Sequence, residues 1–188
     1  MPPGSCPPNP ALASFCSDAC VVCDLTGYSS INAATILGQA PPGFCAGQLH
    51  NTQWVGFIAG SANLTLRIDV YACNQGDGLQ IGIYNTVDCS SFQLVSNCDD
   101  QVPGNTSQNF VANNLTPGGI YFLVIDGAFG DICQFDVTVL SGSVTAPQIT
   151  SGVTDIQYPT PVCPGGTSPS AQPTYSAPVS IPGPRTAT

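Results

Sequence analysis

The chain has 188 residues, two of them basic and eleven acidic, and a formal net charge of −9. It contains no lysine, which excludes Schiff-base catalysis and the phosphate-binding lysine of NTPases. Two arginines are too few to neutralise a nucleic-acid backbone or to hold the protein on an anionic membrane. The length is sufficient for one domain with a buried core, followed by a short extension.

Ten cysteines in such a polar, acidic chain indicate an oxidising compartment and a set of disulfides. The nearest approach to a zinc motif, at Cys16, Cys20 and Cys23, lacks a second Cys-x-x-Cys pair. We therefore predict disulfides, and expect these pairs: Cys89 with Cys98, Cys23 with Cys45, and Cys73 with Cys133.

The start of the chain has no basic segment and no apolar run of the kind found in a signal peptide. No stretch reaches the length of a membrane span. A secreted composition without a leader favours a fragment of a longer extracellular or cell-surface protein. Residues 1–17 are expected to be irregular, and the rest of the N-terminal third to form loops with one or two edge strands, held by disulfides.

From residue 52 to residue 140 the pattern is that of short β-strands separated by Gly/Asn/Asp turns. Three segments alternate strictly, and their apolar faces are Leu64, Leu66, Ile68 and Val70; Leu79, Ile81 and Ile83; and Cys133, Phe135, Val137 and Val139. Residues 119–127 are apolar on both faces, which is typical of a central strand covered on both sides. Segments 54–60 and 92–97 complete the set, and together they predict an all-β antiparallel sandwich.

Several of these pieces, taken together, resemble the pre-peptidase C-terminal-like (PPC-like) domain, most closely the cysteine-bearing form found in secreted and surface proteins of Bacteroidota. The matching pieces are Asn51-x-x-Trp54, Gly78-Leu79-Gln80, Leu115-Thr116-Pro117-Gly118, and Ile125-Asp126-Gly127 with Gly130-Asp131-x-Cys133. The resemblance covers residues 18–142. It implies a jelly-roll-like sandwich that is non-catalytic and appended to enzymes or adhesins.

Residues 143–188 are rich in Pro, Ser and Thr. They fit either an extended linker or the truncated start of a second domain. The run from Cys163 onward resembles the opening of a PKD or other Ig-like repeat.

Two kinds of ligand site are compatible with the sequence. Asp126 and Asp131 bracket a Gly-rich loop and, with Asp77 from another loop, could hold calcium; alternatively these Asp side chains only cap turns. The rings of Tyr71, Tyr84 and Tyr121 could form a platform for sugars, or they could serve as cross-strand partners.

Catalysis is not expected. The single histidine, His50, has no nucleophile motif such as G-x-S-x-G to serve, and no local motif selects a pair of catalytic carboxylates. The sequence therefore predicts a non-catalytic binding or spacer module of a secreted or cell-surface multidomain protein, with an adhesion-related role. The alternative is an accessory domain of a secreted hydrolase, a peptidase, that binds carbohydrate. The expected partners are neighbouring domains and an extracellular glycan or protein, without nucleic acid or membrane insertion.

Overall fold

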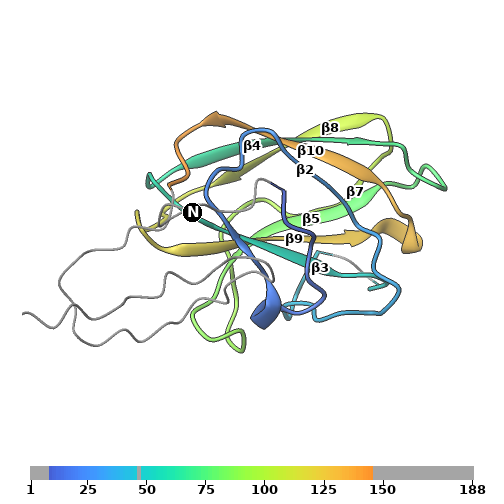
Figure 1. Cartoon of the computed structure of the whole chain (residues 1–188), viewed down its shortest axis with the longest axis horizontal. Coiled ribbons are helices and arrows are strands. Elements are labelled where there is room, and N and C mark those ends of the chain that lie inside the picture. Colours follow the sequence, from blue (N-terminus) through green and yellow to red (C-terminus); the bar gives the residue numbers. More distant parts are fainter. Residues whose placement is uncertain (1–8, 46–47, 146–188) are drawn as a thin grey trace, which may run out of the picture.

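The computed structural model describes residues 9–45 and 48–145. Two β-sheets lie face to face, so the predicted all-β sandwich is confirmed (Figure 1). The six-stranded sheet runs in the order β1 (Val21–Val22), β3 (Gln53–Ile58), β9 (Ile120–Gly127), β5 (Leu79–Asn85) and β6 (Gln93–Leu94), with β7 (Asp99–Val102) also paired to β5. The four-stranded sheet runs in the order β2 (Tyr28–Ile31), β10 (Gln134–Ser141), β4 (Leu64–Tyr71) and β8 (Thr106–Ala112). The described residues also form two 3-10 turns, η1 (Cys16–Asp18) and η2 (Ala128–Gly130). Apart from the parallel pair β1–β3, the ladders between these strands are antiparallel.

The core between the sheets is built from the predicted alternating faces. β4 shows the clearest case, because its even-numbered residues from Leu64 to Val70 are buried while the residues between them are half-buried or exposed. The apolar faces of β5 and β10 meet them in the same cluster. Burial of each such large aliphatic side chain contributes roughly 1.5–3 kcal/mol before the cost of conformational entropy is subtracted.

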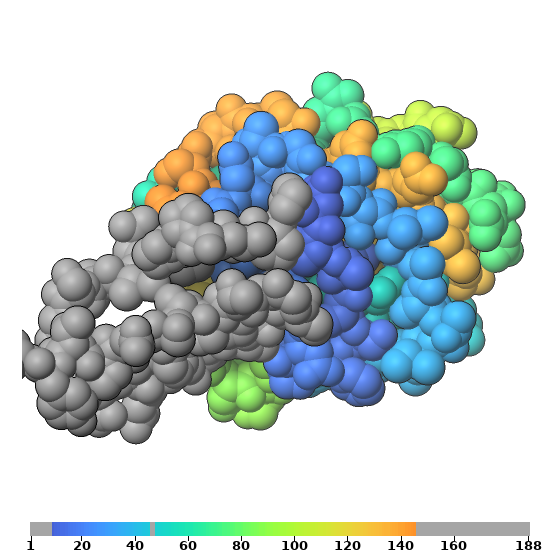
Figure 2. All heavy atoms as spheres, in the orientation of Figure 1, coloured from blue at the N-terminus to red at the C-terminus, as the bar shows by residue number. Residues whose placement is uncertain are grey.

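The six-stranded sheet is buried on both faces, which sequence alternation alone does not predict. β9 has buried residues on both sides, as expected for residues 119–127, but β5 is also buried on the side that carries Gln80 and Tyr84. The N-terminal segment covers this second face: Ala13 forms a bridge with Trp54, and Cys16 packs with Trp54 and Tyr84 in a second apolar cluster. The blue atoms of this segment extend across the molecule in Figure 2.

The N-terminal third matches its prediction of loops with short edge strands. β1 lies at one edge of the six-stranded sheet, and β2 lies at one edge of the other sheet. Residues 98–107 have the Asn-, Asp- and Gly-containing composition of a turn, but they contain β7 and the beginning of β8. Only Phe110 and Ala112 of β8 are buried, so this edge strand has little apolar signal in the sequence. The predicted linker or start of a second domain covers residues 143–188, and from residue 146 onward it lies outside the described part of the chain.

Three disulfides are defined between described residues: Cys16–Cys89, Cys45–Cys98 and Cys73–Cys133. The predicted pair Cys73–Cys133 is confirmed. The predicted pairs Cys89–Cys98 and Cys23–Cys45 are wrong, because the N-terminal segment crosses the second face of the sheet and brings Cys16 and Cys45 to Cys89 and Cys98. Cys20 and Cys23 are also disulfide-bonded, so the Cys16-Cys20-Cys23 pattern offers no thiolates to zinc.

These bridges indicate that the protein matures in an oxidising compartment. Within residues 9–45 and 48–145, no helix has the length and apolar character needed to cross a membrane.

Candidate functional site

Four buried polar residues lie at one end of the sandwich: Asn32, Asn51, Asp126 and Asp131, none more than 5% exposed. We call them the end network. They come from the loop after β2, the loop before β3, the end of β9 and the loop between β9 and β10. A buried polar group is costly unless it is hydrogen-bonded, and each of these side chains has found partners on another segment.

Asp126 fixes the loop that leads into β3. Its Oδ1 atom accepts hydrogen bonds from the backbone N–H of Asn51 at 2.9 Å and from the Thr52 hydroxyl at 2.7 Å. The backbone N–H of His50 lies 3.1 Å from Oδ1 and 3.2 Å from Oδ2. The Nδ1 atom of the His50 ring is 3.7 Å from Oδ2, beyond hydrogen-bond distance.

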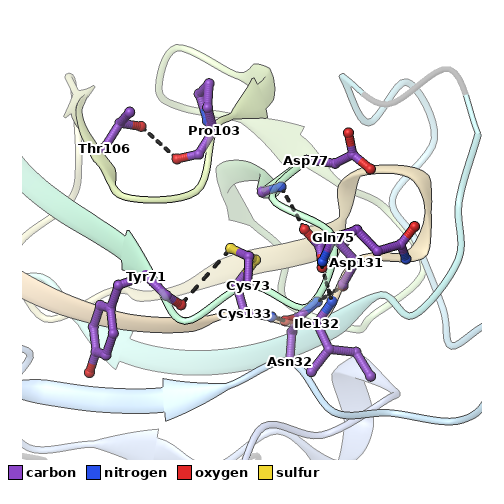
Figure 3. The surroundings of a disulfide bond; sticks show 12 residues. Asn32, Tyr71, Cys73, Gln75, Asp77, Pro103, Thr106, Asp131, Ile132 and Cys133 are labelled. Carbon is purple, nitrogen blue, oxygen red and sulfur yellow. Dashed lines mark hydrogen bonds between the residues drawn. A yellow bond between two sulfur atoms is a disulfide. The ribbon is translucent and has the colours of Figure 1, made fainter.

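Asp131 fixes the loop between β4 and β5. Its carboxylate accepts backbone N–H bonds from Gln75 at 2.9 Å, from Gly78 at 3.0 Å and from Ile132 at 2.8 Å. Burial alone would raise the pKa of Asp131, but the bonds from Gly78, Gln75, Ile132 and Asp77 together hold that pKa below its ordinary value. Figure 3 shows this carboxylate beside the Cys73–Cys133 bridge, with the side chain of Asp77 pointing away from it.

The two asparagines join the loops to one another. The Asn32 amide donates to the carbonyl of Asp131 at 2.9 Å, and its side-chain oxygen accepts from the backbone N–H of Cys133 at 2.7 Å. The Asn51 side-chain oxygen accepts from the N–H of Gly127 at 2.7 Å, while its amide donates to the carbonyls of Asn32 and Asp131. The end network is thus a rigid polar core that holds the loops in place.

This arrangement does not bring the three predicted calcium ligands together. Asp126 and Asp131 each bind the backbone of a different loop, and Asp77 contributes its backbone N–H while its carboxylate points elsewhere. The structure follows the other interpretation, in which the Asp side chains cap backbone N–H groups. Ligand atoms of Cys73, Asp131 and Cys133 also lie within 4.8 Å of one another, but the two sulfurs are joined in a disulfide and are not thiolates.

The three predicted tyrosines do not form a common surface. Tyr84 is 1% exposed and packs beneath the N-terminal segment, where burial raises its pKa to about 12. Tyr121 is buried between the sheets, and its hydroxyl accepts the N–H of Thr116 at 2.8 Å. Only Tyr71 lies on an open sheet face, where its hydroxyl donates to Asp136 at 3.0 Å. Burial of two rings therefore rules out a platform made of all three.

A feature that sequence reasoning missed is Phe129, in the turn η2 between Asp126 and Asp131 of the end network. Its side chain is 68% exposed, and its backbone is left-handed, with φ 53° and ψ 24°. A bulky side chain is rarely found in that conformation, and such strain often marks a functional position. The only sequence signal is the Gly-flanked run from Gly127 to Gly130.

The turn that carries Phe129 is fixed on both sides. The N–H of Gly127 binds Asn51, the N–H of Ala128 binds the carbonyl of Gly78 at 3.0 Å, and the N–H of Asp131 binds the carbonyl of Ala128 at 3.0 Å. The end network therefore presents an exposed aromatic ring on a rigid support.

No protein-family model matches the sequence, and a search of the curated proteins found no significantly similar sequence.

Proposed function

We propose that the chain is a non-catalytic binding module of a secreted or cell-surface multidomain protein. One observation carries the proposal: Phe129 is largely exposed and strained on a loop that the buried end network makes rigid. Left-handed backbone at a bulky residue costs roughly 1–2 kcal/mol, and an exposed ring recovers little of that by burial. A ligand or partner that covers the ring would repay this cost, since a preorganised aromatic anchor loses little entropy on binding.

An adhesion-related role is the form of this function that we favour, and an extracellular glycan is the ligand to test first. A ring face can stack on the C–H face of a sugar, and the loop beside it, from Asn74 to Gly78, carries two side-chain amides and one carboxylate that can bind hydroxyls. The PPC-like resemblance of residues 18–142 agrees with a non-catalytic module. The disulfides support an extracellular site of action.

A glycan array screened with the purified protein tests the proposal. We expect a specific hit that Phe129→Ala weakens at least tenfold. The matched control is Val87→Ala, because Val87 is 89% exposed on the loop that follows β5 and belongs to a different part of the surface. Equal binding by Phe129→Ala and the wild type would show that the η2 turn is not the binding surface. No specific hit would contradict glycan binding and leave an extracellular protein as the partner to test by the same pair of variants.

The alternative is an accessory domain of a secreted peptidase. The sequences that flank this chain in its gene distinguish the two. A protease motif such as H-E-x-x-H favours the accessory domain, whereas tandem Ig-like repeats and a C-terminal sorting domain favour the adhesion module.

A further inference from the structure

Two buried side-chain atoms in the described part of the chain have no hydrogen-bond partner: Nδ1 of His50 and Oε1 of Gln80. Both belong to residues that neighbour Asp126. Gln80 is the direct cross-strand partner of Asp126 between β5 and β9, and the His50 Nδ1 atom lies 3.7 Å from Asp126 Oδ2. An unpaired buried polar atom costs about 1–3 kcal/mol, so two such atoms on residues that neighbour Asp126 point to a missing ligand.

The strand geometry places Gln80 on the same side of the sheet as Asp126. Leu79 and Ile81 face the core between the sheets, so Gln80, which is 7% exposed, faces the second side. Ile125 likewise faces the core, and Asp126 faces the second side with Gln80. Direct partners on one face have Cβ atoms about 4.5–5.5 Å apart, within reach of a glutamine amide.

The Asp126 carboxylate has capacity left on one oxygen. Its Oδ1 atom is occupied by Asn51 and Thr52, whereas Oδ2 has only the longer contact of 3.2 Å from the His50 N–H. No lysine or arginine compensates this fully buried carboxylate among the described residues, because Arg67, the one such residue there, is paired with Asp69.

We infer that His50, Gln80 and Asp126 bind a divalent metal ion of the zinc type. The inference goes beyond the proposed binding role of Phe129. An imidazole nitrogen, a carboxylate oxygen and an amide oxygen form a mixed N/O donor set, which suits zinc better than calcium, since calcium takes six to eight oxygens. At metal–ligand distances of about 2.0–2.2 Å, two donor atoms 3.7 Å apart subtend roughly 115–135° at the ion, within the range of distorted tetrahedral coordination.

The site has no competing ligand among the described residues. The His50 side chain is 23% exposed, but its Nδ1 atom and the Gln80 Oε1 atom are buried, so the ion lies beneath the imidazole ring. The cysteines of the described residues are all in disulfides, and His50 is the single histidine of the sequence. A histidine-to-phenylalanine change therefore removes all imidazole from the untagged protein.

The test is a calorimetric titration of untagged, EDTA-treated protein with ZnCl₂, together with thermal melts at several zinc concentrations. We expect one ion per chain, and a melting temperature that rises with zinc because the folded state binds the ion. His50→Phe and Gln80→Met should each lower the affinity at least tenfold. Asp100→Asn, which changes an exposed carboxylate on β7, should bind zinc as the wild type does.

The inference is overturned if the wild type releases no binding heat and melts alike with zinc and with EDTA. That result would leave a buried water or a charged His50–Asp126 pair at this position. It is also wrong if zinc binds equally well to the wild type, His50→Phe and Gln80→Met. Far-UV circular dichroism identifies a variant that has failed to fold, in which case the other variant decides.

Discussion

The side-chain amide of Asn32 donates a hydrogen bond of 2.9 Å to the main-chain carbonyl of Asp131, 99 residues away in sequence. This bond extends the pairing of β2 with β10 into the loop between β9 and β10, which crosses from one sheet to the other. Because both residues are fully buried, water cannot replace either partner without opening the end of the sandwich.

Asn32→Ala should therefore lower the free energy of unfolding by about 2–4 kcal/mol. It removes the bond to Asp131 and leaves the backbone N–H of Cys133 unpaired, and each buried group without a partner costs about 1–3 kcal/mol. Urea denaturation followed by circular dichroism measures the change. Asn74→Ala is the control, because Asn74 is exposed in the neighbouring loop and its substitution should change the stability by less than about 0.5 kcal/mol. Equal losses in the two variants would contradict a special role for Asn32.

Asp131→Asn should change how stability depends on pH. Since the folded-state pKa of Asp131 lies below the ordinary value of about 3.9, its contribution is complete above pH 4 and is lost as the pH falls through the folded pKa. The variant should be less stable than the wild type at pH 7 by about 1–3 kcal/mol, the cost of mispaired buried donors. The difference between them should shrink between pH 4 and pH 2.

Thermal melts of both proteins across this pH range measure the effect. Asp100→Asn serves as the control for general acid effects, because Asp100 is exposed on β7. A constant gap between wild type and Asp131→Asn down to pH 2 would show that the charged form of Asp131 does not stabilise the fold.

The disulfide Cys16–Cys89 should hold the N-terminal cover on the second face of the six-stranded sheet. The double variant Cys16→Ala, Cys89→Ala should lose about 2–4 kcal/mol of stability, as expected for loss of a long-range bridge. It should also increase acrylamide quenching of Trp54, the single tryptophan, whose indole is fully buried in the cluster that contains Cys16.

The matched control is Cys73→Ala, Cys133→Ala, which removes a bridge at the end network, outside the Trp54 cluster. This variant should lose stability without changing Trp54 quenching in the folded state. Peptide mapping under non-reducing conditions checks the pairing itself; a Cys89–Cys98 peptide would contradict the structure.

The sequence predicted the inter-sheet core well, because alternation in β4, β5 and β10 depends only on neighbouring residues. It misplaced Tyr84 for the same reason. Alternation assigns Tyr84 to the outer side of its strand, but a cover formed by residues far away in the chain buries that side. The disulfide partners of Cys89 and Cys98 were wrong because they, too, depend on the path of this cover.

The candidate site was predicted in part. Asp126 and Asp131 stood out from their Gly-rich surroundings, and both are indeed buried and central to the end network. What the sequence could not provide was the identity of their partners, which are backbone N–H groups of other loops. Gln80 had the appearance of an ordinary surface glutamine in an alternating strand, and only tertiary packing buries its amide.

The left-handed conformation of Phe129 provides a test of whether the exposed ring is retained for binding. Phe129→Gly should leave the protein equally stable or more stable by about 1 kcal/mol, because glycine adopts φ 53° without steric cost and the 68% exposed ring buries little area. Phe129→Ala should relieve much less of the strain, since alanine retains the Cβ atom. Urea denaturation measures the order of the free energies of unfolding of the wild type, Phe129→Ala and Phe129→Gly.

A loss of more than about 1 kcal/mol in Phe129→Gly would mean that the ring stabilises the fold through packing. If Phe129→Gly keeps its stability but loses glycan binding, the ring acts in recognition. A residue that strains the backbone and adds nothing to the core can be retained only for what it contacts outside the fold.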